Sequence, residues 1–473
     1  MRRLTVVCLW MTMLLALACR CIVLSRAVAG GRLCTTERSR EYQDLAKDIA
    51  TGWGRGRTLL YFHGLEYPPG YPVLLASVRL LSERVGLEGR GLEVALWIQV
   101  LVDVHVVLLV YWLCQVCGGP RVGLAGALFY AVDPFAVSAA CTLLPHTLSV
   151  ALLTGSVCLL VRHLTGGGAG ALLLSSAALG SGCYLLPAGL VVAPALASPL
   201  AVVRAPYRLA RGLTFLLLTG LILSPWVVRN RCVEGFTGFS SSWGDALYYG
   251  LCPSVLHHGK GILEAEGREL LVRRERNKIR EIREESNLFP RHRAMSFFEA
   301  LSESDPPSRS VVRRAWRSET AGIGWRQGEA LRIIRDHPWA TVTACAGRCL
   351  SLCESPAGDL LCLTGYGQAE NAPGSVWPFH AALAAHDPGA ASEAGATAMV
   401  VLADTILVAQ YVGIVLALVH FGQKLILPRW LAVGAAVAAG LVVLAVFNGS
   451  DARILLGPVV CAVAGGGWGL RFR

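Results

Sequence analysis

Long apolar runs separated by short polar connections dominate the chain. Many of these runs extend over about 20 residues, the length of an α-helix that crosses the hydrocarbon core of a bilayer. Gly182 and Pro187 interrupt the run over 169–203, so this stretch could form two helices or one long broken helix. We therefore predict an all-α polytopic membrane protein with about ten transmembrane helices. The predicted helices cover residues 4–27, 92–117, 122–141, 146–162, 169–185, 186–203, 211–228, 397–421, 430–447 and 454–470.

The basic residues of the short connections fall on one side of the predicted membrane. With the N-terminus inside, Lys and Arg occur in the inner connections, whereas the short outer connections near 141–146 and 185–187 contain neither. Because basic residues concentrate in cytoplasmic connections, we expect the N-terminus to lie inside and the alternation to hold along the chain. Two long polar segments, 30–91 and 229–396, then lie on the outer side.

These outer segments divide the chain into three predicted parts. The first is an N-terminal membrane module, 1–228, which has about seven helices and carries the first outer loop. The second is a large and mostly helical outer loop over 229–396. The third is a C-terminal membrane module over 397–473, with about three helices.

Both outer segments contain patterns typical of amphipathic or solvated helices. In the first loop, the apolar spacing within Tyr42–Ile49 predicts a short amphipathic helix, and a second interfacial helix begins near Val73. In the second loop, opposite charges four residues apart predict a solvated helix over 262–285. We expect further helices over 321–335 and 338–353.

The composition agrees with this pattern. Hydrophobic residues make up 54% of the chain and charged residues only 16%, whereas soluble domains are about 25% charged. The net charge of +11, from 43 Lys and Arg against 32 Asp and Glu, follows from the inner connections and one Arg-rich loop. No nucleic-acid-binding motif accompanies this charge, so nucleic acid is not an expected partner. The sequence contains no clear set of metal ligands and implies no certain cofactor; a divalent metal is left open.

Six short motifs follow one another in a fixed order. Together they resemble the GT-C glycosyltransferases of the protein O-mannosyltransferase, aminoarabinose-transferase and Rgt-like group. Members of this group are multi-span enzymes that take a sugar from a polyprenyl-phosphate carrier on the outer or lumenal face. The motifs are Glu41–Ala46, Pro68–Pro72, Asp133–Phe135 with Leu143–Leu148, Pro225–Asn230 with Gly244–Gly250, Glu329–Pro338 and Ser450–Arg453.

The resemblance implies a catalytic base in the first outer loop. In the family an Asp, often followed by Glu, opens the helix of this loop and activates the acceptor hydroxyl. The register of this chain places Arg38 and Ser39 at those positions. The candidate bases here are therefore the neighbouring carboxylates Glu41 and Glu37, and Glu66, which matches an acidic residue of some aminoarabinose-transferase-like members.

Two arginines match family positions at the outer ends of predicted helices. Arg229 follows the seventh helix, and Arg453 precedes the last one. Because a guanidinium donates two parallel hydrogen bonds to phosphate oxygens, we expect both to contact the donor phosphate. The side chains expected to contact the acceptor or the loop are Tyr42, Asp44, His63, Tyr67 and His146.

These observations predict an integral membrane glycosyltransferase that performs an inverting hexosyl or pentosyl transfer. Its expected partners are membrane lipids, a polyprenyl-phosphate sugar donor, and a glycan, lipid or protein acceptor. The expected location is a bacterial inner membrane with the loops in the periplasm; the endoplasmic reticulum membrane is the alternative. Two other functions stay open, namely a transporter or flippase of a lipid-linked substrate and a catalytically inactive relative acting as an assembly partner.

Overall fold

The structure is a computed structural model, and it describes most of the chain up to residue 351. Regular structure in the described residues is helical throughout. The described ranges are 2–31, 36–54, 67–187, 189–202, 208–234, 236–285, 309–351 and 405–410, with residues 412, 458, 460, 461 and 463. The N-terminal helices are α1 (Arg2–Ala29), α2 (Glu37–Gly54), α3 (Gly70–Arg84), α4 (Gly91–Gly118), α5 (Pro120–Ala131), α6 (Pro134–Cys141), α7 (His146–Leu164), α8 (Ala169–Leu185), α9 (Gly189–Val202) and α10 (Arg208–Arg229). They are followed by the π-helical turn η2 (Asn230–Glu234), α11 (Ser242–Asp245), the π-helical turn η3 (Ala246–Leu251), α12 (Cys252–Lys260), α13 (Glu264–Glu285), α15 (Arg309–Asp336) and α16 (Pro338–Ser351).

Four helices of the described residues are long and apolar enough to cross a membrane, and a fifth span results if the bent pair α5–α6 counts as one. The four are α1, α4, α7 and α10, which confirms the helices predicted over 4–27, 92–117, 146–162 and 211–228. Residues 169–203 form two shorter apolar helices, α8 and α9, rather than one long helix. The last three predicted spans lie almost entirely outside the described residues.

The span predicted over 122–141 is wrong as a single straight helix. The structure breaks it into α5 and α6, which are bent by 51°. Asp133 adopts an extended conformation at the break, and its carboxylate accepts a hydrogen bond of 3.0 Å from the backbone N–H of Phe135. Pro134 cannot donate the backbone hydrogen bond that would continue α5. Asp133 and Pro134 therefore end one helix and begin the next.

A buried arginine of α1 satisfies the carbonyl groups that this break exposes. Arg20, with no exposed surface, donates to the carbonyl oxygens of Ala131 (2.7 Å) and Tyr130 (3.4 Å) at the end of α5. Its Nε also forms an ion pair with Asp103 of α4, and the Tyr130 hydroxyl donates to the other oxygen of that carboxylate at 2.7 Å. The three helices α1, α4 and α5 are thus connected by one buried polar network.

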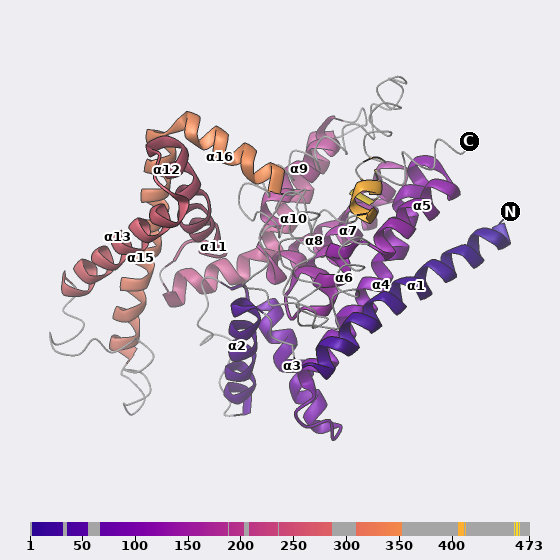
Figure 1. The fold of residues 1–473 in the computed structure, drawn as a ribbon, viewed down its shortest axis with the longest axis horizontal. Helices are drawn as coiled ribbons and strands as arrows, with labels where there is room; N and C mark the ends of the chain where they lie inside the picture. Colours follow the sequence, from indigo (N-terminus) through magenta and orange to yellow (C-terminus); the bar gives the residue numbers. More distant parts are fainter. Residues whose placement is uncertain are drawn as a thin grey trace, which may run out of the picture.

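The membrane helices alternate in direction. Val23 near the end of α1, Leu96 near the start of α4, Leu185 at the end of α8 and Leu223 in the last part of α10 belong to one hydrophobic cluster, which we call the loop-side cluster. The opposite halves of these helices meet in a second cluster. Consequently α2–α3 and the segment after α10 leave the bundle on the same side, as Figure 1 shows with α2, α3 and α11–α16 lying away from the N-terminus.

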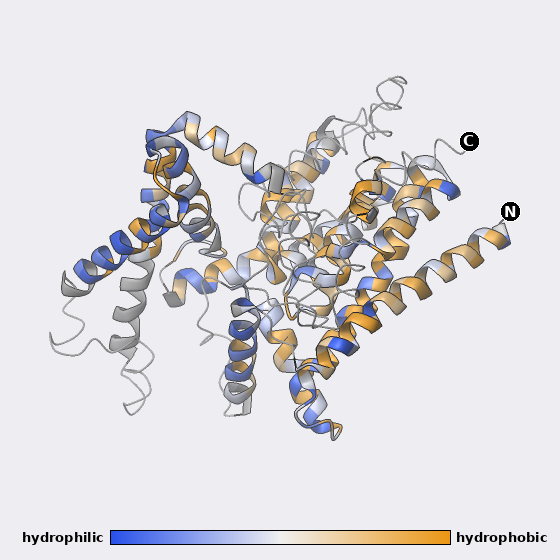
Figure 2. Ribbon diagram, in the orientation of Figure 1, coloured by the Kyte–Doolittle hydropathy of each residue, from blue (hydrophilic) through white to orange (hydrophobic). Residues whose placement is uncertain are grey.

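The helices after α10 have a hydrophobic core of their own. This core contains Leu251, Val255, Leu271, Ile333 and Ala344, contributed by η3, α12, α13, α15 and α16. Figure 2 shows α13 largely hydrophilic and the membrane helices α1 and α4 largely hydrophobic.

The helices predicted in the second loop are confirmed, with changed ends. The solvated helix over 262–285 is α13, and the helix over 338–353 is α16, which ends at Ser351. The helix predicted over 321–335 is longer than expected, because α15 already begins at Arg309. The sequence pattern of 321–335 had captured only the C-terminal half of this helix.

Candidate functional site

The helix of the first loop, α2, begins with a side-chain cap. Thr36 precedes α2, and its hydroxyl accepts a hydrogen bond of 3.1 Å from the backbone N–H of Ser39. The two hydroxyls are also hydrogen-bonded to each other at 2.8 Å, and Ser39 is fully buried. Capping of this kind satisfies the free N–H groups of a helix start. Ser39, at a position where the resemblance expects a carboxylate, therefore has a structural role.

Three tyrosines fix α2 against the membrane bundle. The Tyr42 ring makes edge contacts with Tyr67 and Tyr71, with centroids 4.9 and 5.0 Å away. The Tyr71 hydroxyl donates to Oε1 of Gln99 on α4 at 2.6 Å, and Nε2 of Gln99 donates to the Thr142 carbonyl at 3.0 Å. A polar and aromatic chain thus runs from α2 through α3 and α4 to the end of α6.

The Pro68–Pro72 motif begins α3 in tight contact with the end of α8. A Cβ atom at Gly70 would lie 2.5 Å from the carbonyl oxygen of Tyr184, so only glycine fits there. The next residue, Tyr71, is completely buried. The motif places Tyr67, directly before it, beside α2.

Tyr67 in turn holds a carboxylate. Its hydroxyl donates a hydrogen bond to Oε2 of Glu41, and the Glu41 side chain is half-buried. Asp44, one turn further along α2, is exposed. Although Asp48 is exposed, partial desolvation by its neighbours, together with the nearby charge of Asp44, raises the pKa of its carboxyl above the usual value. The described first-loop carboxylates thus differ in their surroundings, and Glu41 is the one fixed to the Pro68–Pro72 motif.

The end of α10 carries a buried arginine. Arg229 is 6% exposed, its Nη1 donates to Oδ1 of Asn230 at 3.0 Å, and its guanidinium lies 4.8 Å from the centre of the Trp226 ring. Asn230 is completely buried, and its Nδ2 donates to the carbonyl oxygens of Gly238 (3.0 Å) and Phe239 (3.2 Å). Asn230 thereby links the guanidinium to the chain that follows η2.

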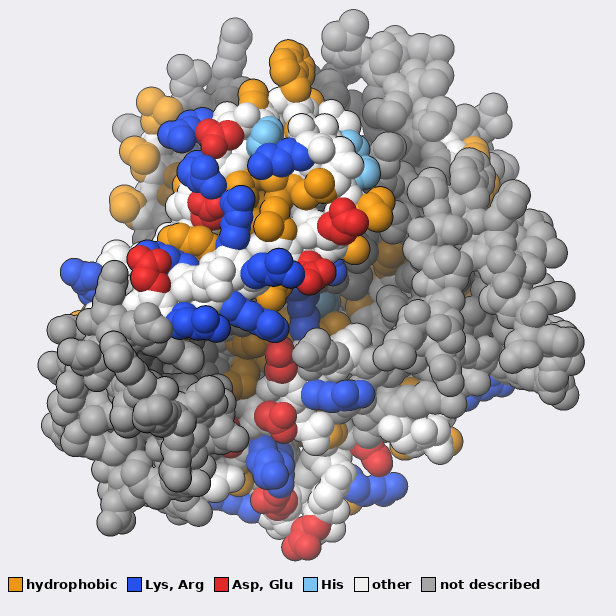
Figure 3. Space-filling model, turned by 60° about the vertical axis from the view of Figure 1, so that its left-hand side comes forward, with side chains coloured by type: hydrophobic (Ala, Val, Ile, Leu, Met, Phe, Trp, Pro, Cys, Tyr) orange, Lys and Arg blue, Asp and Glu red, His pale blue; other side chains and the backbone are white. Residues whose placement is uncertain are grey.

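Residues near Glu41 and residues near Arg229 belong to the same hydrophobic cluster. Tyr42 and Tyr71 from the first loop and Trp226 and Phe239 from the end of α10 all belong to the loop-side cluster. Figure 3 shows the corresponding face of the molecule, with charged side chains over the loop helices above and α2 below, and hydrophobic side chains recessed between them. Glu41, through Tyr67, and Arg229, through Trp226, are thus each held next to a member of the loop-side cluster.

Of the other residues predicted to belong to the site, the structure describes the side chain of His146 but not those of Glu37, His63, Glu66 and Arg453. His146 begins α7 and is 2% exposed, next to Leu148 of the loop-side cluster. The Glu37 side chain, His63, Glu66 and Arg453 lie outside the described residues, so their predicted roles stay predictions. Among the described residues there is no group of three or more His, Cys, Asp or Glu side chains that could hold a metal ion.

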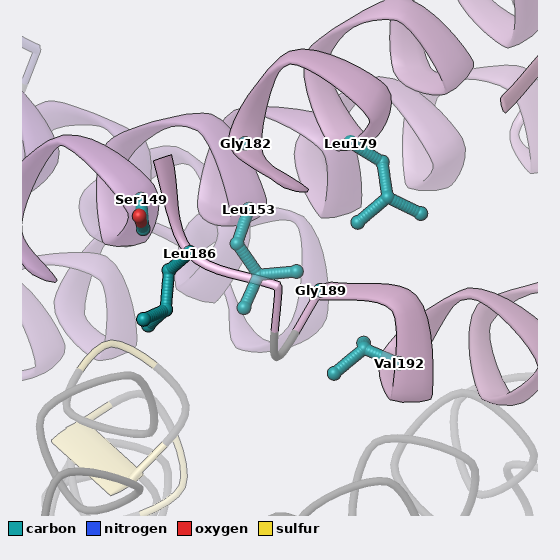
Figure 4. A pocket seen from close by; sticks show the side chains of 7 residues that line it. All are labelled: Ser149, Leu153, Leu179, Gly182, Leu186, Gly189 and Val192. Carbon is teal, nitrogen blue, oxygen red and sulfur yellow. The ribbon is translucent and has the colours of Figure 1, made fainter. Parts of the chain in front are cut away.

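An apolar pocket lies within the bundle. Leu153 of α7, Leu186 between α8 and α9, and Gly189 and Val192 of α9 are among its lining residues, and Ser149 contributes the single hydroxyl group. Figure 4 shows these side chains around the short connection between α8 and α9. Its lining suits an apolar group.

Three polar residues of the structure were not expected from the sequence. Gln99 and Arg20 each interrupt a predicted apolar span, and an isolated polar residue in such a run is a signal for a buried partner. Asn230 ends a motif that was recognised, but its role depends on the carbonyl groups of Gly238 and Phe239. Those contacts cannot be inferred from residue spacing.

Comparisons with known proteins agree with the fold. The model of the dolichyl-phosphate-mannose-protein mannosyltransferase family matches residues 68–228. One similar solved structure is the archaeal oligosaccharyltransferase AglB from Archaeoglobus fulgidus in complex with an inhibitory peptide and a dolichol-phosphate, with 12% identity and a TM-score of 0.54. Another is the Archaeoglobus fulgidus oligosaccharyltransferase in the apo form, with 14% identity and a TM-score of 0.52.

These similarities extend along this chain but not along the whole of the other proteins. The matches cover 100% and 99% of this chain and 50% of each solved chain, so this chain spans about half their length. No curated protein sequence matches the chain. Residues 68–228 thus match the model of the dolichyl-phosphate-mannose-protein mannosyltransferase family, and the chain shares its fold with the archaeal oligosaccharyltransferase, with four helices of the described residues long and apolar enough to cross a membrane.

Proposed function

We propose that the protein transfers a sugar from a polyprenyl-phosphate carrier to a glycan, lipid or protein acceptor on the membrane face where its two loops emerge. The observation that carries this proposal is that Tyr67, which holds Glu41, and Trp226, which lies against Arg229, belong to one hydrophobic cluster. Mannose is the first sugar to test, because the matching family is named for dolichyl-phosphate-mannose.

Each of these groups has a defined chemical task. Glu41 accepts the proton of the acceptor hydroxyl, whose oxygen attacks the anomeric carbon as the bond to the phosphate oxygen breaks. The configuration at that carbon inverts, and polyprenyl phosphate leaves with the bonding electrons. Arg229 donates hydrogen bonds to this phosphate as its negative charge grows. Tyr67 holds the Glu41 carboxylate on the acceptor side.

The remainder of the proposal concerns the membrane and the organisation of the chain. We place the protein in a bacterial inner membrane with its loops in the periplasm, and the endoplasmic reticulum membrane is the alternative. The three-part division into 1–228, 229–396 and 397–473 belongs to the same proposal.

The test uses the full chain reconstituted into liposomes with radiolabelled mannosyl-phosphoryl-polyprenol and an envelope extract as acceptor. Glu41→Gln removes the base without changing the size of the side chain, so transfer is expected to fall by about 10²–10⁴-fold. Glu88→Gln, at an exposed position between α3 and α4, is the matched control and keeps the activity. Unchanged transfer in Glu41→Gln would overturn the base assignment.

A transporter or flippase is the second candidate, and two observations favour it. The break between α5 and α6 and the buried Arg20–Asp103 pair are features that transporters place within the membrane. A fluorescent polyprenyl-phosphate lipid in the same liposomes separates the two functions. Movement of this lipid between leaflets without sugar transfer supports the flippase, and the absence of both activities supports an inactive relative.

A further inference from the structure

The helix α16 has one face without charge. Trp339 is 82% exposed and Val342 is 58% exposed, and Ala346, one turn further, is also exposed. The other side of the helix packs on the core of the loop helices through Ala344, which is 2% exposed. Thr343 is the polar member of this face, and its hydroxyl donates to the carbonyl oxygen of Trp339 at 3.1 Å. The exposed face of α16 is therefore uncharged and mostly apolar in a part of the chain that lies outside the membrane spans.

The one charged side chain of α16 is turned away from this face. Arg348 is half-buried, and its Nη2 lies 3.1 Å from where a Cβ atom of Gly250 would be, so it lies against η3. The charges at the end of α15 are balanced, since Arg332 pairs with Glu329 at 2.6 Å and Arg335 with Asp336 at 3.4 Å. Arg348 itself lies near Glu264 and Arg268, and α12, which packs on α16, ends at Lys260. These charges lie beside the uncharged face of α16 and not on it.

A face of this kind fits the boundary of a bilayer. Tryptophan concentrates at the level of the lipid headgroups, and amphipathic helices lie there with their apolar side in the acyl region. The membrane helix α10 already presents exposed leucines, among them Leu213, Leu217 and Leu221, on its lipid-facing side. In the view of Figure 1, α16 runs from α12 in the direction of α9 and α10.

We propose that α16 lies in the bilayer leaflet on the loop side, with Trp339 and Val342 inserted among the lipids. The helix then tethers α11–α15 to the membrane and fixes their position over the loop-side cluster. Because the inserted face itself carries no charge, burial of apolar surface drives the insertion, and salt does not weaken it. This inference does not depend on the proposed sugar transfer.

Fluorescence of Trp339 in the full chain tests the proposal. The chain is reconstituted in neutral phosphatidylcholine nanodiscs, and the spectrum of Trp339→Phe is subtracted from that of the unaltered protein. The difference emission is expected to be quenched by lipids brominated near the headgroup and not by iodide in the water. The quenching is expected to be the same at low and high salt.

Two references make the result decisive. The first is Trp243→Phe, which removes a tryptophan that is 43% exposed on α11; the difference emission should be quenched by iodide and not by brominated lipid. The second is Trp10→Phe, which removes a tryptophan that is 61% exposed in α1; the difference emission should be quenched by brominated lipid. Moving the tryptophan one turn, with Val342→Trp in the Trp339→Phe background, should restore the lipid quenching. Quenching of Trp339 by iodide alone overturns the proposal, and so does protection from both quenchers, which would mean that protein covers this face.

Discussion

Asn230 is the residue on which the geometry of Arg229 depends. Its amide accepts from the guanidinium and donates to the carbonyl oxygens of Gly238 and Phe239. We expect Asn230→Ala to raise the KM for the polyprenyl-phosphate donor about tenfold or more, because one hydrogen bond to a charged group contributes about 1.5–3 kcal/mol. The measurement is the donor dependence of transfer in liposomes.

The aspartate variant distinguishes the two tasks of this amide. Asn230→Asp keeps an acceptor for Arg229 but removes the two donated hydrogen bonds, and its carboxylate neutralises the guanidinium. It is therefore expected to raise the donor KM by a factor whose free-energy equivalent is larger than the loss in the free energy of unfolding. Asn277→Ala on the exposed side of α13 is the control. An unchanged donor KM in both Asn230 variants would contradict the role of Asn230 in positioning Arg229.

A second prediction concerns the stability effect of a side chain at Gly70. A methyl group there would lie 2.5 Å from the backbone oxygen of Tyr184, and backbone cannot move aside as a side chain can. Gly70→Ala is expected to destabilise the protein by about 1–3 kcal/mol, the usual range for overpacking. Gly155→Ala is the matched control, since nothing lies within 4 Å of the added atom, and thermal unfolding in detergent compares them. Equal midpoints would show that α3 and α8 are not in close contact.

The sequence motifs identified which residues matter, but they did not show what those residues contact. The Pro68–Pro72 motif was visible in the sequence, and the structure adds the reason, which is the contact of Gly70 with α8. Ser39 was recognised as a departure from the family, but its bond to Thr36 as a helix cap could only be seen in the structure. Side-chain partners that are distant in sequence, as for Gln99 and Thr142, leave no trace in residue spacing.

Among the elements, the broken helix α5–α6 depends on a partner from α1. Removing one member of a buried ion pair leaves an uncompensated charge and costs about 3–5 kcal/mol. Asp103→Leu is therefore expected to lower thermal stability strongly, since Arg20 stays buried. The double variant Arg20→Met with Asp103→Leu should recover part of this loss, because neither charge is then left alone. His105→Ala, on the exposed side of α4, is the control.

This network also shows why the single helix over 122–141 was a wrong prediction. Hydropathy averages over the whole run and is nearly unaffected by one Asp-Pro pair. The break is stable because Arg20 donates to the freed carbonyl groups of α5, and Arg20 is more than 100 residues away in sequence. Helix positions could be predicted from apolar length, but bends set by distant side chains could not.

The contact between α13 and α15 carries a pH-dependent prediction. Glu329 accepts hydrogen bonds from Arg332 and from Arg274 of α13, and these bonds lower the pKa of the Glu329 carboxyl. A lowered pKa stabilises the folded state above the usual carboxyl pKa, and this stabilisation is lost as the pH falls through the lowered value. Glu329→Gln is expected to cost about 1 kcal/mol at neutral pH, since the pair is partly exposed, and nothing at acid pH.

Thermal unfolding of the loop helices across the acid range measures this effect. The unaltered chain should lose stability on acidification more steeply than Glu329→Gln, and the two should converge at the acid end. Glu281→Gln is the control, because its ion pair with Lys278 is exposed. A constant difference between the two proteins at all pH values would contradict the assignment.

For the whole molecule, the sequence predicted the membrane helices better than it predicted how the loop helices pack. Apolar length and basic connections predicted helices and their alternation, because each depends on local composition. The loop helices were located, but their packing on a separate core and the direction of α16 depend on contacts between distant elements. The candidate site depends on both kinds of information, since Glu41 and Arg229 are 188 positions apart in the sequence and only the structure shows that their neighbours Tyr67 and Trp226 belong to one hydrophobic cluster.

That arrangement requires both loops to lie on one side of the membrane. We expect a membrane-impermeant maleimide to label Glu88→Cys, before α4, and Glu266→Cys, in α13, from the same side of sealed vesicles, and Gly168→Cys, between α7 and α8, from the other. The three positions are exposed, and replacement of the exposed Cys232 by serine removes a competing thiol. Labelling in intact cells then shows which side faces outward, where the proposal places both loops. If Glu88→Cys and Glu266→Cys reacted from opposite sides, the first-loop helix and the end of α10 could not form one site, and the assignment of Glu41 and Arg229 to a single transfer reaction would fail.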